Sequence, residues 1–113
     1  MPIWTVQSVN EQPNLTLCPW LIFEFQHDGK TLRAAIGYCI EITEARTTSP
    51  IEKFNIAALV AETQSGRIYK LSGPPGASRD ALYVWQNLAV LRGIKAYKDV
   101  SNEVYSEYLK AIQ

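Results

Sequence analysis

The sequence predicts an α+β domain, with an antiparallel sheet of about five or six strands packed on one face by a long helix and a second, C-terminal helix. Two observations predict this fold class. Up to Gly76, segments that alternate apolar and polar residues are separated by turn residues. After Gly76, apolar residues recur at helical spacing. With 113 residues, 47% of them hydrophobic, the chain fits one compact domain over residues 1–113.

The first hairpin is predicted from residues 17–43. Residues 31–43 alternate strictly, residues 17–26 are rich in aromatic and branched side chains, and Asp28-Gly29 between them is typical of a two-residue turn. A turn there places Glu24 opposite Arg33, a favourable cross-strand pair. The same register pairs Phe25 with Leu32, Phe23 with Ala34, Leu21 with Ile36, Ile22 with Ala35, Trp20 with Gly37, and Cys18 with Cys39, unless a bulge at Pro19 breaks it.

Further strands are predicted on both sides of this hairpin. Residues 56–63 and 67–71 flank a turn at Ser65-Gly66, which places Val60 opposite Leu71. Residues 3–9 form another strand, and residues 51–54 are either a short strand or the entry to the next one.

Two helices and a short strand complete the domain. Ser78 is a good N-cap for the long helix, Asp80 suits its first turn, and Gly93 is a natural stop, with Ile94 placed to pack back on the last turn. A strand over residues 95–100 precedes the second helix, which Ser101 caps. The apolar stripes are Leu82, Trp85, and Leu88 or Ala89 in the long helix and Val104, Tyr108, Leu109 and Ile112 in the second.

Composition argues against several classes of function. The 11 Lys and Arg residues balance the 11 Asp and Glu residues, and the densest basic stretch, residues 92–98, holds only three cations, so we do not expect nucleic-acid binding. The start lacks a secretion signal and no apolar run reaches the length of a membrane span, which predicts a soluble, cytoplasmic protein. One histidine and two cysteines give no metal-ligand spacing, and reduced, packed thiols are expected at Cys18 and Cys39.

The loop over residues 73–80, GPPGASRD, begins like the phosphate loop of ATPases. Its diagnostic positions differ, because Ser78 replaces the second glycine, Arg79 the lysine, and Asp80 the hydroxyl that would bind magnesium. We therefore interpret it as a structural loop that ends in a helix cap.

No catalytic residues and no cofactor are predicted. His27, Asp28 and Glu24 could form an acid/base group, but the hairpin register places no Ser or Cys nucleophile beside them. A structural role in the turn and in a pair with Arg33 explains the same residues.

The face of the first hairpin that carries Glu24 and Arg33 becomes apolar away from the turn, and we expect its apolar end to be covered. The N-terminal strand with Trp4, the final helix, or another copy of the protein could provide this cover. We expect a homodimer that uses this surface or the sheet edge beside it. The interface residues are Trp20, Ile22, Glu24, Arg33, Ala35 and Gly37.

Residues 65–85 resemble stretches of small uncharacterised bacterial proteins carried on mobile gene cassettes of the integron type. The resemblance rests on Gly66, Tyr69, Gly73, Pro74, Pro75, Gly76 and Trp85. It implies no activity, and is consistent with an accessory protein that has a narrow binding role.

The sequence favours a non-enzymatic binding or interaction module that self-associates through its sheet and acts on a protein partner. The alternative is a small-molecule binder or minor enzyme, with a pocket between the sheet and the long helix lined by Tyr38, Tyr69 and Trp85. A pocket of this kind needs a cavity of about 300–1,000 Å³ with a few convergent polar groups.

Overall fold

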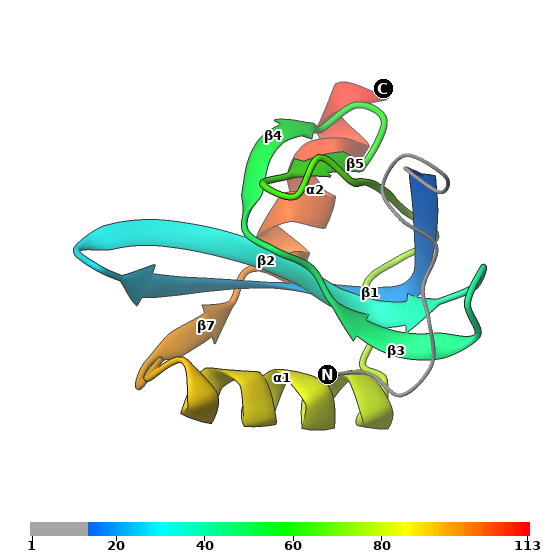
Figure 1. Ribbon diagram of the computed structural model, residues 1–113. Helices are drawn as coiled ribbons and strands as arrows, with labels where there is room; N and C mark the ends of the chain where they lie inside the picture. Colours follow the sequence, from blue (N-terminus) through cyan, green and yellow to red (C-terminus); the bar gives the residue numbers. More distant parts are fainter. Residues whose placement is uncertain (1–13) are drawn as a thin grey trace.

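The computed structural model describes residues 14–113 and has an α+β fold with a seven-stranded, mostly antiparallel sheet and a helix on each side of its first hairpin (Figure 1). Its strand order is β3-β2-β1-β6-β5-β4, and β7 also pairs with β1. The predicted strand over residues 3–9 lies outside the described residues. The elements are β1 (Asn14–His27), β2 (Lys30–Cys39), β3 (Glu44–Thr47), β4 (Ile51–Asn55), β5 (Val60–Thr63), β6 (Ile68–Leu71), α1 (Arg79–Leu91), β7 (Tyr97–Asp99) and α2 (Ser101–Ala111).

The β1–β2 hairpin has the predicted register from Trp20–Gly37 through Glu24–Arg33 to His27–Lys30. Its turn is formed by Asp28 (φ 51°) and Gly29 (φ 75°), both left-handed, as the favoured two-residue hairpin turn requires. Because the side chains alternate between the faces of a strand, this register sends the apolar residues of β1 and β2 into two separate cores.

Beyond Trp20 the register shifts, so the alternative of a bulge at Pro19 is the one observed, and Cys39 pairs with Leu17 rather than with Cys18. The shift occurs at Pro19, which has no N–H for the ladder and follows a cis peptide bond. Opposite it, Gly37 leaves no room for a side chain, because a Cβ there would collide with the Pro19 carbonyl oxygen. Both cysteines are free thiols.

The β5–β6 hairpin is one residue out of the predicted register, since Val60 pairs with Lys70 rather than Leu71. The reason is a connection of three residues, 64–66, in place of a two-residue turn. Thr63 N–H donates to the Arg67 carbonyl at 3.0 Å, and Gly66 takes a left-handed φ of 88°. The strand β5 is also shorter than predicted, because residues 56–59 form the turn that joins it to β4.

The strands β1 and β6 pair in parallel, which the prediction of a purely antiparallel sheet missed. Residues 14–17 of β1 lie beside residues 68–71 of β6. The Gly-Pro loop that follows β6 then crosses back over β1. Gly76 N–H donates to the Trp20 carbonyl at 3.0 Å, and Trp20 Nε1 donates to the Gly73 carbonyl at 2.9 Å. The loop therefore closes over the bulge of β1.

The ends of α1 are as predicted. Ser78 Oγ accepts a hydrogen bond from Ala81 N–H at 3.4 Å. At the other end Gly93 has φ 69°, and Ile94 N–H donates to the Ala89 carbonyl at 2.8 Å. This hydrogen bond, together with the contact between the two side chains, is the Schellman pattern.

The start and the apolar stripe of α2 differ from the prediction. Ser101 is the first residue of α2 rather than its N-cap, and Asp99 Oδ1 instead accepts the Ser101 N–H at 2.8 Å. The Ser101 hydroxyl is turned toward β1, where it bonds Ile22. The buried stripe runs through Val104 with Tyr105 and Tyr108 half-buried beside it, whereas Leu109 and Ile112 are exposed.

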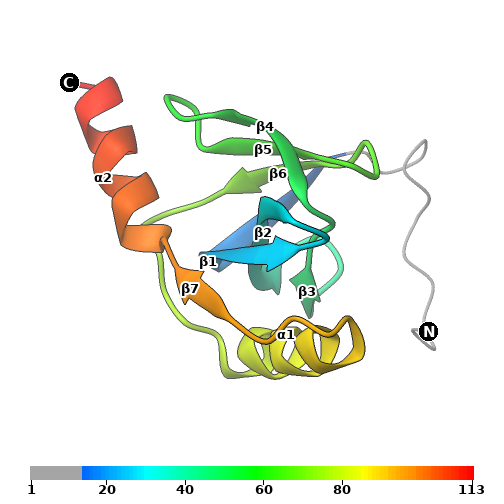
Figure 2. The ribbon, with the colours of Figure 1, turned by 90° about the vertical axis from the view of Figure 1, so that its left-hand side faces the viewer.

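The two faces of β1 belong to different cores. One core lies between the hairpin and α1, and the other lies between the hairpin, α2 and the layer formed by β4, β5 and β6 (Figure 2). The α1 core contains Leu21, Phe23, Phe25, Ala34, Ile36, Ala81, Trp85, Ala89 and Ile94. The α2 core contains Leu15, Leu17, Trp20, Ile22, Ala35, Cys39, Leu59, Tyr69, Leu71, Val100 and Val104.

Candidate functional site

The apolar part of the predicted interface is buried inside the chain. Trp20 and Ala35 are fully buried, and Ile22 is 1% exposed. Helix α2 covers this surface, which is one of the three predicted alternatives, and its Val104 packs in the same core. Gly37 is also buried. This surface therefore cannot receive a second copy while α2 is in place.

The charged part of that surface is only half-buried, with the Glu24 side chain 20% exposed and the Arg33 side chain 42% exposed. Glu24 Oε1 lies 3.2 Å from Arg33 Nε, as the register predicts, and Glu24 Oε2 lies 3.4 Å from Lys98 Nζ. Lys98 is directly opposite Glu24 in the β1–β7 ladder. The hydrogen bond from Arg33, followed by that from Lys98, holds the pKa of the Glu24 carboxyl below its ordinary value.

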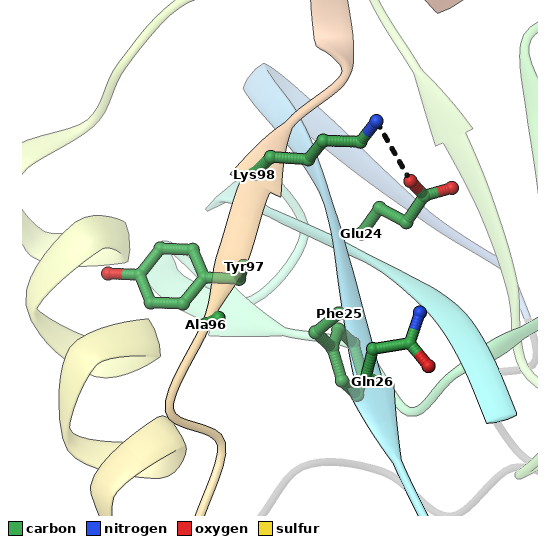
Figure 3. Close-up of a pocket in the computed structure, with 6 residues that line it drawn as sticks. All are labelled: Glu24, Phe25, Gln26, Ala96, Tyr97 and Lys98. Carbon is green, nitrogen blue, oxygen red and sulfur yellow. Dashed lines mark ion pairs between the residues drawn. The ribbon is translucent and has the colours of Figure 1, made fainter. Parts of the chain in front are cut away.

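An open depression lies over this charged group, between β1 and β7 (Figure 3). Its volume is about 330 Å³, and it is lined by Glu24, Phe25, Gln26, Ala96, Tyr97 and Lys98. Figure 3 shows Lys98 reaching toward Glu24 while the Tyr97 ring points toward α1. A carboxylate held in its charged form between two cations is a weak proton acceptor, so this arrangement favours a structural role over acid/base catalysis.

The structure does not bring the three predicted pocket residues together. Tyr69 is buried in the α2 core, where its hydroxyl accepts a hydrogen bond from Arg46 Nε at 2.7 Å. Trp85 is buried in the α1 core, on the other side of the hairpin. Tyr38 is 36% exposed and belongs to neither core. The sequence pattern identified the aromatic residues but not the face on which each one lies.

A small cavity does lie between α1 and the sheet, and Trp85 lines it. Its volume is about 40 Å³, well below the size of a metabolite pocket. Trp85 Nε1 is buried and has no hydrogen-bond partner among residues 14–113. The lining residues are Phe25, His27, Leu32, Ala34, Thr48, Pro50, Trp85, Leu88, Arg92 and Ile94.

The outward side of α1 is apolar and exposed, a feature that the sequence analysis missed. Tyr83, Val90 and Leu91 are 67%, 80% and 83% exposed, and Val84 is 37% exposed. Residues 81–91 contain no charged side chain, although one side of this helix faces solvent. A surface helix normally carries charged or polar residues on its outer side. The uncharged run was the signal that could have revealed this face.

We call this surface the α1 outer face and define it as Tyr83, Val84, Asn87, Val90 and Leu91. At about 100° per residue, these five positions fall within about 120° of one another around the helix axis, so they share one side of the helix. The buried residues Ala81, Trp85 and Ala89 lie on the other side.

Within residues 14–113, no group of three or more His, Cys, Asp or Glu side chains is placed to hold a metal ion. Nor does that part of the chain contain a helix long and apolar enough to span a membrane. No family model, no curated protein and no solved structure matches this chain.

Proposed function

We propose that the chain is a non-enzymatic interaction module that binds a protein partner through the α1 outer face. The observation that carries this proposal is the exposure of Tyr83, Val90 and Leu91 on a helix whose middle has no charge. Apolar groups gathered on one exposed surface favour a protein contact, whereas scattered ones do not.

The energetics support a binding role. Complete burial of a side chain such as Val90 or Leu91 stabilises a complex by about 1.5–3 kcal/mol. Tyrosine is among the residues that most often dominate binding energy at protein interfaces. The face also rests on a firm base, because Trp85 on the inner side of α1 packs against Phe23 and Phe25 with ring centroids 5.2 and 5.4 Å apart.

Photo-crosslinking tests the proposal in cells of the source organism. Benzoyl-phenylalanine replaces Val90 in one variant and the exposed Leu109 of α2 in a matched control. We expect an adduct from position 90 only, and we expect Leu91→Glu in the same chain to abolish it. The adduct partner, identified by mass spectrometry, should then bind the purified chain with an affinity that Leu91→Glu weakens at least tenfold. Equal adducts from both positions, or none from position 90, would overturn the proposal.

A small-molecule binder or minor enzyme is the second candidate, and the unpartnered Trp85 Nε1 beside the α1 cavity favours it. A ligand with an acceptor atom could bond this donor if the cavity opened beyond about 40 Å³. A thermal-shift screen against metabolites separates the candidates: a reproducible rise in Tm with one ligand class, lost in Trp85→Phe, supports the pocket. If no ligand in the screen raises the Tm, the result supports the interaction surface.

The cytoplasm is the location we propose, on the basis of the two free thiols. The role of an accessory protein, suggested by the resemblance of residues 65–85 to gene-cassette proteins, stays a prediction.

A further inference from the structure

We infer that the α1 outer face binds a second copy of this chain, as an antiparallel helix pair with its two-fold axis at Asn87. This inference rests on the proposed function and names the partner of the same surface. It replaces the buried sheet surface with an exposed helix as the site of self-association.

The spacing of the exposed apolar residues is symmetric about Asn87. Val84 and Val90 are three residues before and after it, and Tyr83 and Leu91 are four residues before and after it. All four side chains are more than a third exposed. In a two-fold antiparallel pair with its axis at Asn87, the residue n positions after it in one copy faces the residue n positions before it in the other. The symmetric spacing therefore places apolar side chains opposite apolar side chains, a match that an unrelated partner would not require.

In an antiparallel pair centred on Asn87, the symmetric positions of the two copies face each other. Tyr83 of one copy meets Leu91 of the other, and Val84 meets Val90. The outer pairs are about 12 Å apart along the helix axis, because eight residues separate Tyr83 from Leu91 at a rise of about 1.5 Å each. The smaller valines lie nearer the axis and the larger side chains lie farther out, which suits two helices that cross at an angle.

The electrostatics of the face also permit the pair. No charged residue lies between Asp80 and Arg92, so two copies bring no like charges together at the centre. The helix dipoles run in opposite directions in an antiparallel pair, which is favourable. The Asn87 amide both donates and accepts, so it can bond its own copy on the axis. A single asparagine within an apolar helix interface is a known way to fix register at some cost in stability.

The contact area sets the expected strength. The helix α1, Arg79–Leu91, is about 20 Å long and about 10–12 Å wide, a footprint far below the roughly 800 Å² per partner of a standard interface. We therefore expect a weak dimer that dissociates in the micromolar range, and the experiment must reach high concentration.

Sedimentation velocity of the purified chain from about 5 to 500 µM tests the inference. We expect a shift from monomer to dimer that Val90→Glu weakens at least tenfold, because each dimer would then place two carboxylates against apolar side chains. Leu109→Glu, at an exposed leucine of α2, should leave the dimer unchanged. Circular dichroism should show that both variants melt like the parent. A dimer that survives Val90→Glu, or a monomer at every concentration, would overturn the inference.

Cysteine crosslinking tests the register. Chains carrying Tyr83→Cys and chains carrying Leu91→Cys, mixed under mild oxidation, should form a covalent heterodimer faster than either chain forms a homodimer. An antiparallel pair centred on Asn87 places these two positions together, whereas a parallel pair in register places each position opposite itself. A disulfide requires Cα atoms about 4.4–6.8 Å apart. Equal rates of disulfide formation for the heterodimer and for both homodimers would contradict the antiparallel register. If the chain is monomeric but position 90 still yields an adduct with another protein, the second copy is excluded while the proposed function stands.

Discussion

The Ser101 hydroxyl lies 2.7 Å from the backbone nitrogen of Ile22, and both residues are buried. This hydrogen bond joins the first turn of α2 to the middle of β1, next to the point where Val100 N–H donates to the Ile22 carbonyl at 2.9 Å. The side chain of Ser101 thus continues the β1 pairing after β7 has ended. The second helix is fixed to the sheet by a polar contact as well as by its apolar side chains.

Ser101→Ala should destabilise the fold by about 1–3 kcal/mol, because it leaves the buried Ile22 N–H without an acceptor. Urea denaturation, followed by circular dichroism, measures the loss. Ser106→Ala, at an exposed position of the same helix, is the matched control and should change the free energy of unfolding by less than about 0.5 kcal/mol. Equal effects of the two substitutions would show that the hydrogen bond contributes little.

Gly37→Ala should cost about 1–3 kcal/mol or more, because a Cβ there meets the backbone of the bulge, including Trp20 Cα at 3.1 Å. Gly76→Ala is a useful comparison, since its nearest neighbour is the Pro19 side chain at 3.3 Å. We expect a clearly smaller loss there. The order of the two urea midpoints checks the prediction, and a Gly37→Ala chain as stable as the parent would refute it.

The two buried tryptophans should respond differently to replacement by phenylalanine. Trp20→Phe removes the hydrogen bond from Nε1 to the Gly73 carbonyl, whereas Trp85 Nε1 has no such partner within residues 14–113. The change in side-chain size is the same, so the extra loss in Trp20→Phe should be about 1 kcal/mol. Unfolding free energies of the two variants test this, and a larger loss in Trp85→Phe would be the contrary result.

The Glu24 group predicts a pH dependence. The pKa of Glu24 in the fold is lowered from its ordinary value of 4.5, so its contribution to stability is present above that value and is lost as the pH falls through the lowered one. The Tm difference between the parent and Glu24→Gln should therefore be positive near pH 7 and shrink toward zero in acid. Salt at about 1 M should also shrink it, because the Arg33 and Lys98 side chains are 42% and 66% exposed and ions in solution screen them.

The matched control for this experiment is Glu52→Gln, at an exposed glutamate of β4 that makes no ion pair within residues 14–113. Because Glu52 makes none of the ion pairs that Glu24 makes, Glu52→Gln should change the Tm near pH 7 less than Glu24→Gln does. If the Tm difference between the parent and Glu24→Gln grows as the pH falls, the predicted direction of the pH dependence is wrong.

Local signals in the sequence predicted local structure well. Asp28-Gly29 fixed the β1–β2 register as far as Trp20, and Ser78 and Gly93 marked the ends of α1. Each of these residues acts through its own backbone or a neighbour a few residues away, so no knowledge of the rest of the chain was needed.

The errors arose where distant parts of the chain meet. The parallel pairing of β1 with β6 leaves no mark in either segment, because both read as apolar strands whatever their direction. Ser101 has the residue type of a helix cap, but its hydroxyl is used by Ile22, 79 residues away. The α1 outer face is a different kind of error, because its signal, the uncharged run over residues 81–91, is local to the helix.

The separation of Ser101 from Ile22 has a consequence for synthesis on the ribosome. At about 5–20 residues per second, Ile22 is made roughly 4–16 s before Ser101, the first residue of the helix that covers it. During this interval Trp20 and Ile22 have no cover from their own helix. The nascent chain must therefore shield them by transient collapse or by a chaperone, and its yield in cells should depend on which of these acts first.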